Sequence, residues 1–261
     1  MTFELFTETI KNEISMKAGK GYSVTVREVD KNNGICLKGL MITGESSNVA
    51  PTIYLDEFYD AFIGGMSIDG IVEQIWAIYK AEVPKSNLDM SFFRSFEQVK
   101  DQICYRLVNL EQNKRLLEQI PHIDFLDLAI CFYYSFHTEE IGEASILIRN
   151  SHMEMWGITT SDLLRCASEN TPKLFEEESY SMLSALKGFL EEKEEWDEEQ
   201  INKTEMELKS LPMRILSNKS RIYGASCMLY PNVLDKLGEE FDCNFFILPS
   251  SIHEGATRFV A

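Results

Sequence analysis

The spacing of apolar residues predicts a helix and a hairpin at the start of the chain. Phe6, Ile10 and Ile14 recur at helical intervals, which predicts a helix over residues 2–17. The runs YSVTVREV and GICLKGLMIT are typical of strands, and DKNNG joins them. Asn and Gly tolerate the positive φ of a tight turn, so we expect a hairpin there. Ser67 precedes the isoleucine-rich run IDGIVEQIWAIYK and is expected to cap a second helix.

The pattern changes after a polar stretch at residues 84–89. ICYRLVN, FLDLAICFYYSF and ASILIRN indicate strands, and LEQNKRLLEQI indicates a helix that ends before Pro121. TTSDLLRCASEN indicates another helix, in which Thr159 and Asp162 have the spacing of a capping box. Further on, MRILSN and NFFILPS indicate strands on either side of a helix near CMLYPNVLDKLGEEF.

These patterns predict an α+β fold in two parts. Residues 1–85 would form a smaller N-terminal α+β portion, and residues 86–261 a main α+β domain with an acidic insert around residues 190–210. In the main domain, the five strands ICYRLVN, FLDLAICFYYSF, ASILIRN, MRILSN and NFFILPS would form one antiparallel sheet with helices mainly on one face. A chain of 261 residues can bury such a core without a disulfide or a metal.

The charge of the chain is strongly negative. Its 25 basic and 42 acidic residues give a net charge of −17. Phosphate contacts dominate nucleic-acid affinity, so this charge opposes direct binding to nucleic acid, and it likewise opposes an anionic membrane. The same charge favours a basic protein partner. The sharpest run of acids is EEKEEWDEE, whose candidate docking residues are Glu191, Glu192, Glu194, Glu195, Asp197, Glu198 and Glu199.

The six cysteines lie mostly in apolar runs, and no CxxC pair occurs. This arrangement fits reduced, buried thiols better than a zinc site or a disulfide framework. The N-terminus carries acids where a secretory signal carries basic residues. The most apolar run is about half the length needed to span a bilayer. We therefore expect a cytoplasmic protein that holds no metal and no cofactor.

Two segments of the chain resemble each other. ILIRNSHMEMWGITTSDLLRCASE and MRILSNKSRIYGASCMLYPNVLDKLGEE each run from a strand through an Asn and a nearby Ser to an aromatic–Gly pair and a helix. The matched residues are Asn150 with Asn218, Trp156 with Tyr223, and Gly157 with Gly224. One interpretation is structural, because Asn and Gly shape turns. The other is that both turns line one cleft where strands lead into helices, which makes Asn150, Trp156, Asn218 and Tyr223 candidate binding residues.

The segment LPSSIHE near the end of the chain supplies the residue types of a catalytic triad. A nucleophilic serine needs a base and an orienting acid, and Ser251, His253 and Glu254 are candidates. His152 in the first of the two similar segments is a further candidate. A hydrolase would need all of these to meet in one pocket. In the alternative interpretation Pro249 ends a strand and the polar side chains bond to the main chain of the turn.

Five segments together resemble a known family. They are NVAPTIYLDEFYDAF, PHIDFLDLAICFYY, ILIRNSHMEMWGITTSDLLRCASENTP, IYGASCMLYPNVLDKLGEEF and NFFILPSSIHE, and they resemble an uncharacterised DUF5688-like family of Firmicutes. MWGITTSDLL is also distantly similar to the YtpQ family, whose role is likewise unknown. The resemblance implies a bacterial cytoplasmic protein. It brings no catalytic residues to this chain.

Two functions fit these observations. The first is a non-enzymatic interaction or regulatory protein that docks on a basic partner, such as a protein that handles nucleic acid. Host-defence inhibitors that mimic nucleic acid are one class of this kind. The second is a hydrolase-like enzyme that uses the Ser, His and Glu near the C-terminus. The first function predicts binding that weakens as salt rises.

Overall fold

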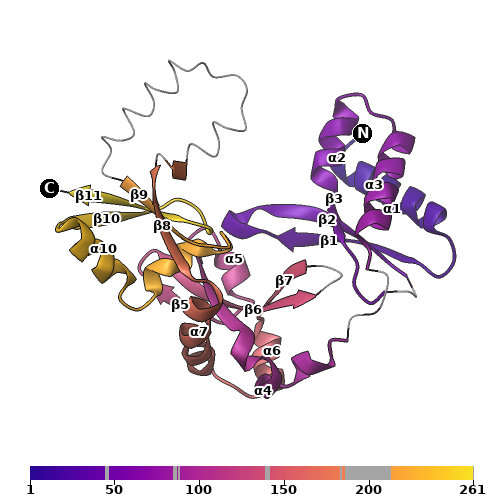
Figure 1. The fold of residues 1–261 in the computed structure, drawn as a ribbon. Helices are drawn as coiled ribbons and strands as arrows, with labels where there is room; N and C mark the ends of the chain where they lie inside the picture. Colours follow the sequence, from indigo (N-terminus) through magenta and orange to yellow (C-terminus); the bar gives the residue numbers. More distant parts are fainter. Residues whose placement is uncertain are drawn as a thin grey trace, which may run out of the picture. The chain divides into compact units, whose positions relative to one another are not determined.

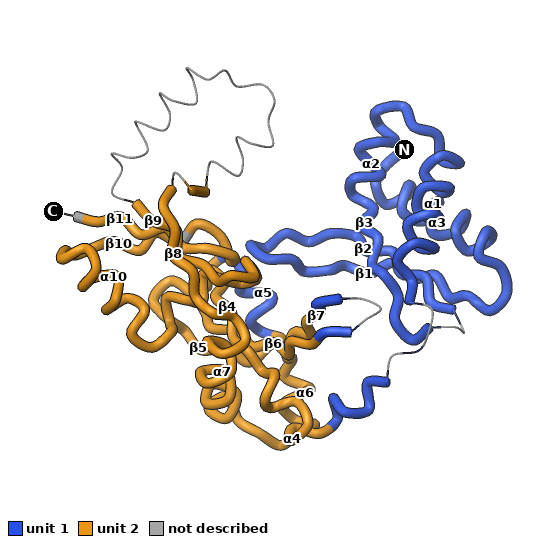
Figure 2. The backbone as a smooth tube through the Cα atoms, viewed as in Figure 1, with its two compact units in different colours: residues 1–94, 112–118, 137–144 blue, residues 95–111, 119–136, 145–261 orange. Residues whose placement is uncertain are grey.

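The computed structural model describes residues 1–44, 47–84, 87, 89–138, 142–182, 184–185 and 213–260. The predicted acidic docking residues at 191–199, and the insert around them, lie outside these residues. The chain divides into two compact units (Figure 2). The first unit comprises residues 1–94, 112–118 and 137–144, and the second comprises residues 95–111, 119–136 and 145–261. Helices and antiparallel sheets occur together (Figure 1), which confirms the α+β fold class.

The first unit packs helices against a small sheet. Its elements are α1 (Phe3–Ala18), β1 (Ser23–Asp30), the 3₁₀ turn η1 (Asn32–Gly34), β2 (Cys36–Thr43), β3 (Thr52–Tyr54), α2 (Leu55–Ile63), α3 (Ile68–Glu82), the 3₁₀ turn η2 (Ser91–Arg94) and α5 (Lys114–Leu117). The strands pair in the order β1-β2-β3. Phe6, Ile10 and Ile14 are buried on the inner face of α1, as predicted. They share one core with residues of β2 and α3, so the apolar spacing identified the packing face correctly.

The hairpin turn forms as predicted. Asn33 and Gly34 take φ angles of 60° and 70°, which Asn and Gly adopt more readily than other residues. The Asn33 main-chain N–H donates to Oδ1 of Asn113 at 3.0 Å, and Asn113 is buried. A Cβ on Gly34 would lie 3.0 Å from the carbonyl oxygen of Gln112. The hairpin turn is therefore packed against the segment that carries α5.

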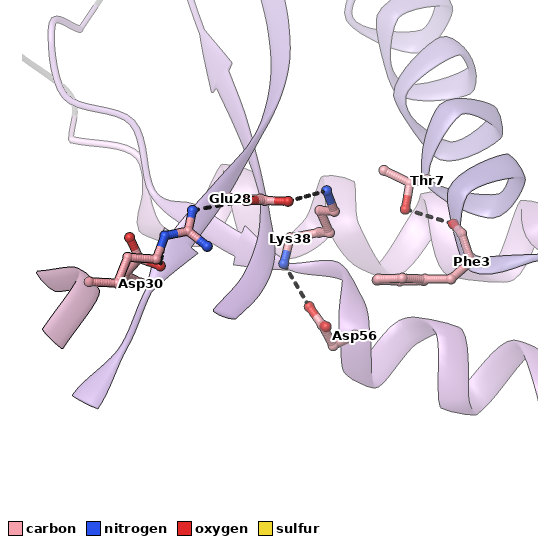
Figure 3. A network of polar contacts seen from close by, with 7 residues as sticks. Phe3, Thr7, Glu28, Asp30, Lys38 and Asp56 are labelled. Atoms are coloured by element: carbon pink, nitrogen blue, oxygen red, sulfur yellow. Dashed lines mark hydrogen bonds and ion pairs between the residues drawn. The ribbon is translucent and has the colours of Figure 1, made fainter. Parts of the chain in front are cut away.

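A charged network extends from the same hairpin (Figure 3). The main-chain N–H of Lys38 donates to Asp56 at 2.9 Å, and its Nζ donates to Glu28 at 3.0 Å. Arg115 donates to Glu28 at 3.1 Å and pairs with Asp30 at 3.3 Å. The two cations hold the pKa of the Glu28 carboxyl below its usual range. Exposed pairs contribute little stability each, so the network mainly orients the segment that carries Arg115.

The remaining strands form two sheets, whereas a single sheet was predicted. The remaining helices and strands follow in chain order. They are α4 (Phe96–Val99), η3 (Lys100–Gln102), β4 (Ile103–Asn109), β5 (His122–Phe125), β6 (Leu128–Thr138), β7 (Gly142–Leu147), α6 (Asn150–Trp156), α7 (Thr160–Leu174), β8 (Glu177–Ser181), β9 (Met213–Asn218), η4 (Gly224–Leu229), α10 (Val233–Phe241), β10 (Asn244–Pro249) and β11 (Gly255–Val260). One sheet has the order β4-β6-β5, with β7 paired to β6. The other has the order β10-β11-β9-β8.

The separation into two sheets has a clear cause. The predicted strands MRILSN and NFFILPS became β9 and β10, but they do not pair with each other or with β6. The strand β11 lies between them and pairs with both, and β8 pairs with the other side of β9. The sequence pattern did not identify β8 and β11, because EESYS has only one apolar residue and the apolar residues of GATRFV do not alternate with polar ones.

The predicted helix LEQNKRLLEQI is mostly wrong. Only Lys114–Leu117 forms a helical turn, α5. The N–H of Leu110 donates to the carbonyl oxygen of Asp127 at 3.0 Å, so the start of this segment bonds outside any helix. Asn113 is buried against the hairpin turn. Tertiary contacts thus override the helical spacing.

Helix α7 starts with the predicted capping box. The Thr159 hydroxyl oxygen accepts from the N–H of Asp162 at 3.3 Å. The Asp162 carboxylate accepts from the N–H of Thr159 at 3.0 Å and from its hydroxyl at 2.7 Å. These bonds lower the pKa of the Asp162 carboxyl. A lowered pKa in the folded state means that the stabilisation is present above the unfolded pKa of about 3.9 and is lost as the pH falls further.

We therefore predict that Asp162→Asn is less stable than the wild type near neutral pH and that the difference shrinks below about pH 4. In acid the wild-type carboxyl becomes protonated and loses the same interactions that the substitution removes. Urea denaturation of both proteins at about pH 7 and about pH 3 measures the difference. A difference that stayed constant between the two pH values would contradict the prediction.

The six cysteines differ sharply in exposure. Three are buried, Cys104, Cys131 and Cys227, while Cys36 is exposed and Cys166 and Cys243 are half-buried. Burial raises the pKa of the three buried thiols to about 12. Since the thiolate is the reactive form, these thiols should be inert at neutral pH. The prediction that the cysteines are buried therefore holds for three of the six.

We predict that a thiol-alkylating reagent labels Cys36 first in the native protein. Cys166 and Cys243 should follow more slowly, because they are partly accessible. The three buried cysteines should react only after denaturation. Peptide mass spectrometry of a labelling time course identifies each site, and early labelling of a buried cysteine would contradict the assigned core.

Candidate functional site

The second of the two similar segments meets the C-terminal turn in the second unit. Asn218 ends β9 with a buried side chain, whose Nδ2 donates to the carbonyl oxygen of Ile222 at 2.8 Å and whose Oδ1 accepts from the N–H of Ile222 at 3.1 Å. The hydroxyl of Ser217 donates to the main-chain oxygen of His253 at 2.7 Å. A Cβ on Gly224 would lie 2.5 Å from the same oxygen. The turn after β9 and the loop between β10 and β11 are therefore held together by contacts with main-chain groups.

Tyr223 is held in this turn by three neighbouring side chains. Its backbone has a φ of 52°, which is unusual for a bulky residue. The buried ring of Tyr133 meets it edge-on at 4.9 Å between centroids. The guanidinium of Arg106 lies 4.9 Å from its centroid, and the ring of His253 stacks on it at 5.7 Å. Tyr223 therefore links the turn to strands β4 and β6.

The predicted triad residues lie in the loop between β10 and β11. The Ser251 hydroxyl accepts from the main-chain N–H of His253 at 3.0 Å, and the Ser251 N–H donates to the carbonyl oxygen of Glu254 at 3.1 Å. Nδ1 of His253 lies 3.2 Å from the nitrogen of Tyr223 and 3.1 Å from the carbonyl oxygen of Arg221. These are bonds to main-chain groups, and they fit the interpretation in which the polar side chains stabilise the turn. The hydrolase hypothesis stays a prediction.

Asn150, His152 and Trp156 lie on α6. Nδ1 of His152 accepts from the N–H of Arg149 at 3.1 Å, and its ring is 5.8 Å from that of Trp156. Burial and then the charge of Arg149 lower the pKa of the His152 imidazole. Asn150 starts a helix, whereas its counterpart Asn218 ends a strand. The two similar segments therefore have different local structures.

A groove of about 770 Å³ lies between α10 and the start of β10. Leu234, Gly238 and Phe245 form the apolar part of its lining, together with Cys243 and Asn244. Three carboxylates also line it: Asp235, Glu239 and Asp242. Asp235 and Glu239 are four residues apart and lie on one side of α10, and Asp242 is the residue that caps the end of the helix. The four-residue spacing of these two acids is visible in the sequence, but it was not recognised as a candidate site.

The three carboxylates have no ion pair or hydrogen bond with the other residues that the structure describes, and all three are exposed. The charged neighbours Lys236 and Glu240 are paired, with Glu177 at 3.6 Å and Arg214 at 3.9 Å. Glu239 and Asp242 also lie at the C-terminal end of α10, where the helix dipole is itself negative. The groove therefore concentrates negative potential that a cationic group can relieve.

No group of three or more His, Cys, Asp or Glu side chains in the described part of the chain is arranged to hold a metal ion. Among the same residues, no helix has the length and apolar character needed to cross a membrane.

Comparison with known proteins adds one match. The model of a family described as a family of unknown function, DUF5688, matches residues 3–255. No curated protein and no solved structure shows significant similarity to the chain.

Proposed function

The chain belongs to DUF5688, a family of unknown function, and we propose that it is a non-enzymatic interaction protein that docks on a basic protein partner. In this proposal the protein acts in the bacterial cytoplasm. Its partner is a basic protein that handles nucleic acid, because such a protein complements the negative charge of this chain. Its net charge of −17 favours such a partner over nucleic acid itself.

The acidic groove carries this proposal. It combines three exposed carboxylates, unpaired among the described residues, with apolar lining from Leu234, Gly238 and Phe245. A Lys or Arg side chain matches both features, because its alkyl stem packs on apolar surface while its charged end meets carboxylates. The bonds of Ser251 and His253 to main-chain groups, by contrast, leave the hydrolase without a supporting contact.

Affinity capture from native lysate tests the proposal. The tagged full chain is compared with the double variant Asp235→Asn/Glu239→Gln at about 0.1 M and about 1 M salt, across which the Debye length falls from about 10 to about 3 Å. Each capture is repeated after nuclease treatment. We expect a basic protein that survives nuclease, is lost at high salt, and is lost or greatly reduced with the double variant.

A matched control separates the groove from the overall charge. Glu57→Gln/Asp60→Asn removes two exposed carboxylates from α2 and leaves the same net charge as the groove variant. Circular dichroism checks that both variants fold. Equal loss of the partner in both variants, or a partner that is released by nuclease, would show that the groove is not the docking site.

A further inference from the structure

Strand β10 lies at an open edge of its sheet. In the order β10-β11-β9-β8 it pairs with β11, and no second strand pairs with it within the described residues. Its residues NFFILP carry no charge. Natural sheets usually protect such edges with charged side chains, as the opposite edge strand β8 does with Glu177 and Glu178. The edge of β10 has no charged side chain, and its proline, Pro249, lies only at the end of the strand, so residues 244–248 can offer their main-chain groups to a partner strand.

The two faces of β10 have different surroundings. Phe245 faces α10, since a Cβ built on Gly238 would lie 3.8 Å from its ring. Side chains alternate along a strand, so Phe246 and Leu248 lie on the opposite face, where they are 64% and 43% exposed. A strand added to this edge would place one row of side chains toward the acidic groove and the other row beside Phe246 and Leu248.

Resting on the proposed function, we propose that the basic partner binds as an extended segment that adds to the free edge of β10 as a further strand. Every second residue of this segment is Lys or Arg and pairs with Asp235, Glu239 or Asp242. The residues between are aliphatic and pack on Phe246 and Leu248. Main-chain hydrogen bonds to β10 supply affinity, and the alternation of charge supplies specificity.

A second copy of this chain fits the edge less well than a basic segment does. Its own β10 carries no Lys or Arg to meet the three carboxylates. Self-pairing would also bring a second set of carboxylates toward the first, and like charges at an interface are unfavourable. The chemistry of the groove thus selects a cationic strand.

Fluorescence anisotropy with a labelled octapeptide of alternating lysine and valine tests the inference. The same peptide with an N-methyl group on every main-chain nitrogen is the key comparison, because it keeps the charge and side chains but has no N–H donor on either edge to pair with a strand. We expect the methylated peptide to bind the wild-type chain about tenfold more weakly or worse, since several hydrogen bonds are lost. Phe246→Lys should weaken the unmodified peptide similarly, by removing apolar contact and placing a cation at the edge.

Leu5→Lys is the control, since it adds the same charge at an exposed apolar position on α1, and it should leave binding within about twofold. Equal binding of the two peptides would overturn strand addition, yet the groove could still attract cations, so the proposed function would stand. Absence of binding by the unmodified peptide would also overturn strand addition, whatever lysate capture shows. Loss of the captured partner in both charge variants would instead overturn the proposed function.

Discussion

Gly224→Ala is expected to destabilise the second unit by about 3 kcal/mol or more. The added Cβ would overlap the Ser217 hydroxyl oxygen, and it would lie 2.5 Å from the main-chain oxygen of His253 and 2.8 Å from the nitrogen of Asn218. Two of these atoms belong to the main chain and cannot rotate away. Relief would therefore separate β9 from the C-terminal turn and break the hydrogen bond that Ser217 donates to His253.

Urea denaturation followed by circular dichroism measures this loss, and Gly238→Ala is the matched control. A Cβ on Gly238 would lie 3.8 Å from the ring of Phe245, which is an ordinary contact. Because alanine is the better helix former, the control should be neutral or up to about 1 kcal/mol more stable. Similar stability of the two variants would mean that the turn around Gly224 is looser than its contacts indicate.

Gly224 shows which features the sequence could reveal. The aromatic–Gly pattern marked this residue as special, but the pattern fits any turn that needs a small residue. Part of the reason for glycine lies in His253, which is distant in the chain and is brought to the turn by the β10-β11 loop. Sequence reasoning therefore found the residues of this cluster but could not tell a structural turn from a catalytic centre.

Local signals gave the most reliable predictions. The cap at Ser67, the capping box of Thr159 and Asp162, and the positive φ of Asn33 all depend on neighbouring residues, and all three are present. Sheet membership depends instead on partners far along the chain. The pairing of β11 with β9 has no signal in either strand alone, so the single predicted sheet separated into two.

The acidic groove was missed for a related reason. Composition directed attention to the acids at 191–199, where the charge is densest along the sequence. In the described structure, what distinguishes Asp235, Glu239 and Asp242 is the apolar lining beside them and their lack of an ion pair with any other described residue. Both properties arise only when β10 packs next to α10. The arrangement of these charges in space therefore could not be predicted from charge density along the chain.

Phe6→Ala is expected to cost the first unit about 3–5 kcal/mol. Phe6 is fully buried, and its ring lies 5.3 Å from that of Tyr59 and 5.5 Å from that of Phe62. Truncation removes these aromatic contacts and leaves a cavity between α1 and α2. Since a domain is stabilised by only about 5–15 kcal/mol in total, this loss should increase the unfolded fraction of the unit substantially.

Hydrogen exchange measured by mass spectrometry locates the effect, and Leu5→Ala on the same helix is the control. Leu5 is 58% exposed, so its truncation leaves no cavity and should change stability by no more than about 0.5 kcal/mol. Peptides from α1, α3 and β2 should exchange much faster in Phe6→Ala than in Leu5→Ala, because these elements share the Phe6 core. Equal exchange in the two variants would contradict a core built around α1. Faster exchange confined to α1 would instead show that the helix can detach while the sheet stays folded, which the shared core makes unfavourable.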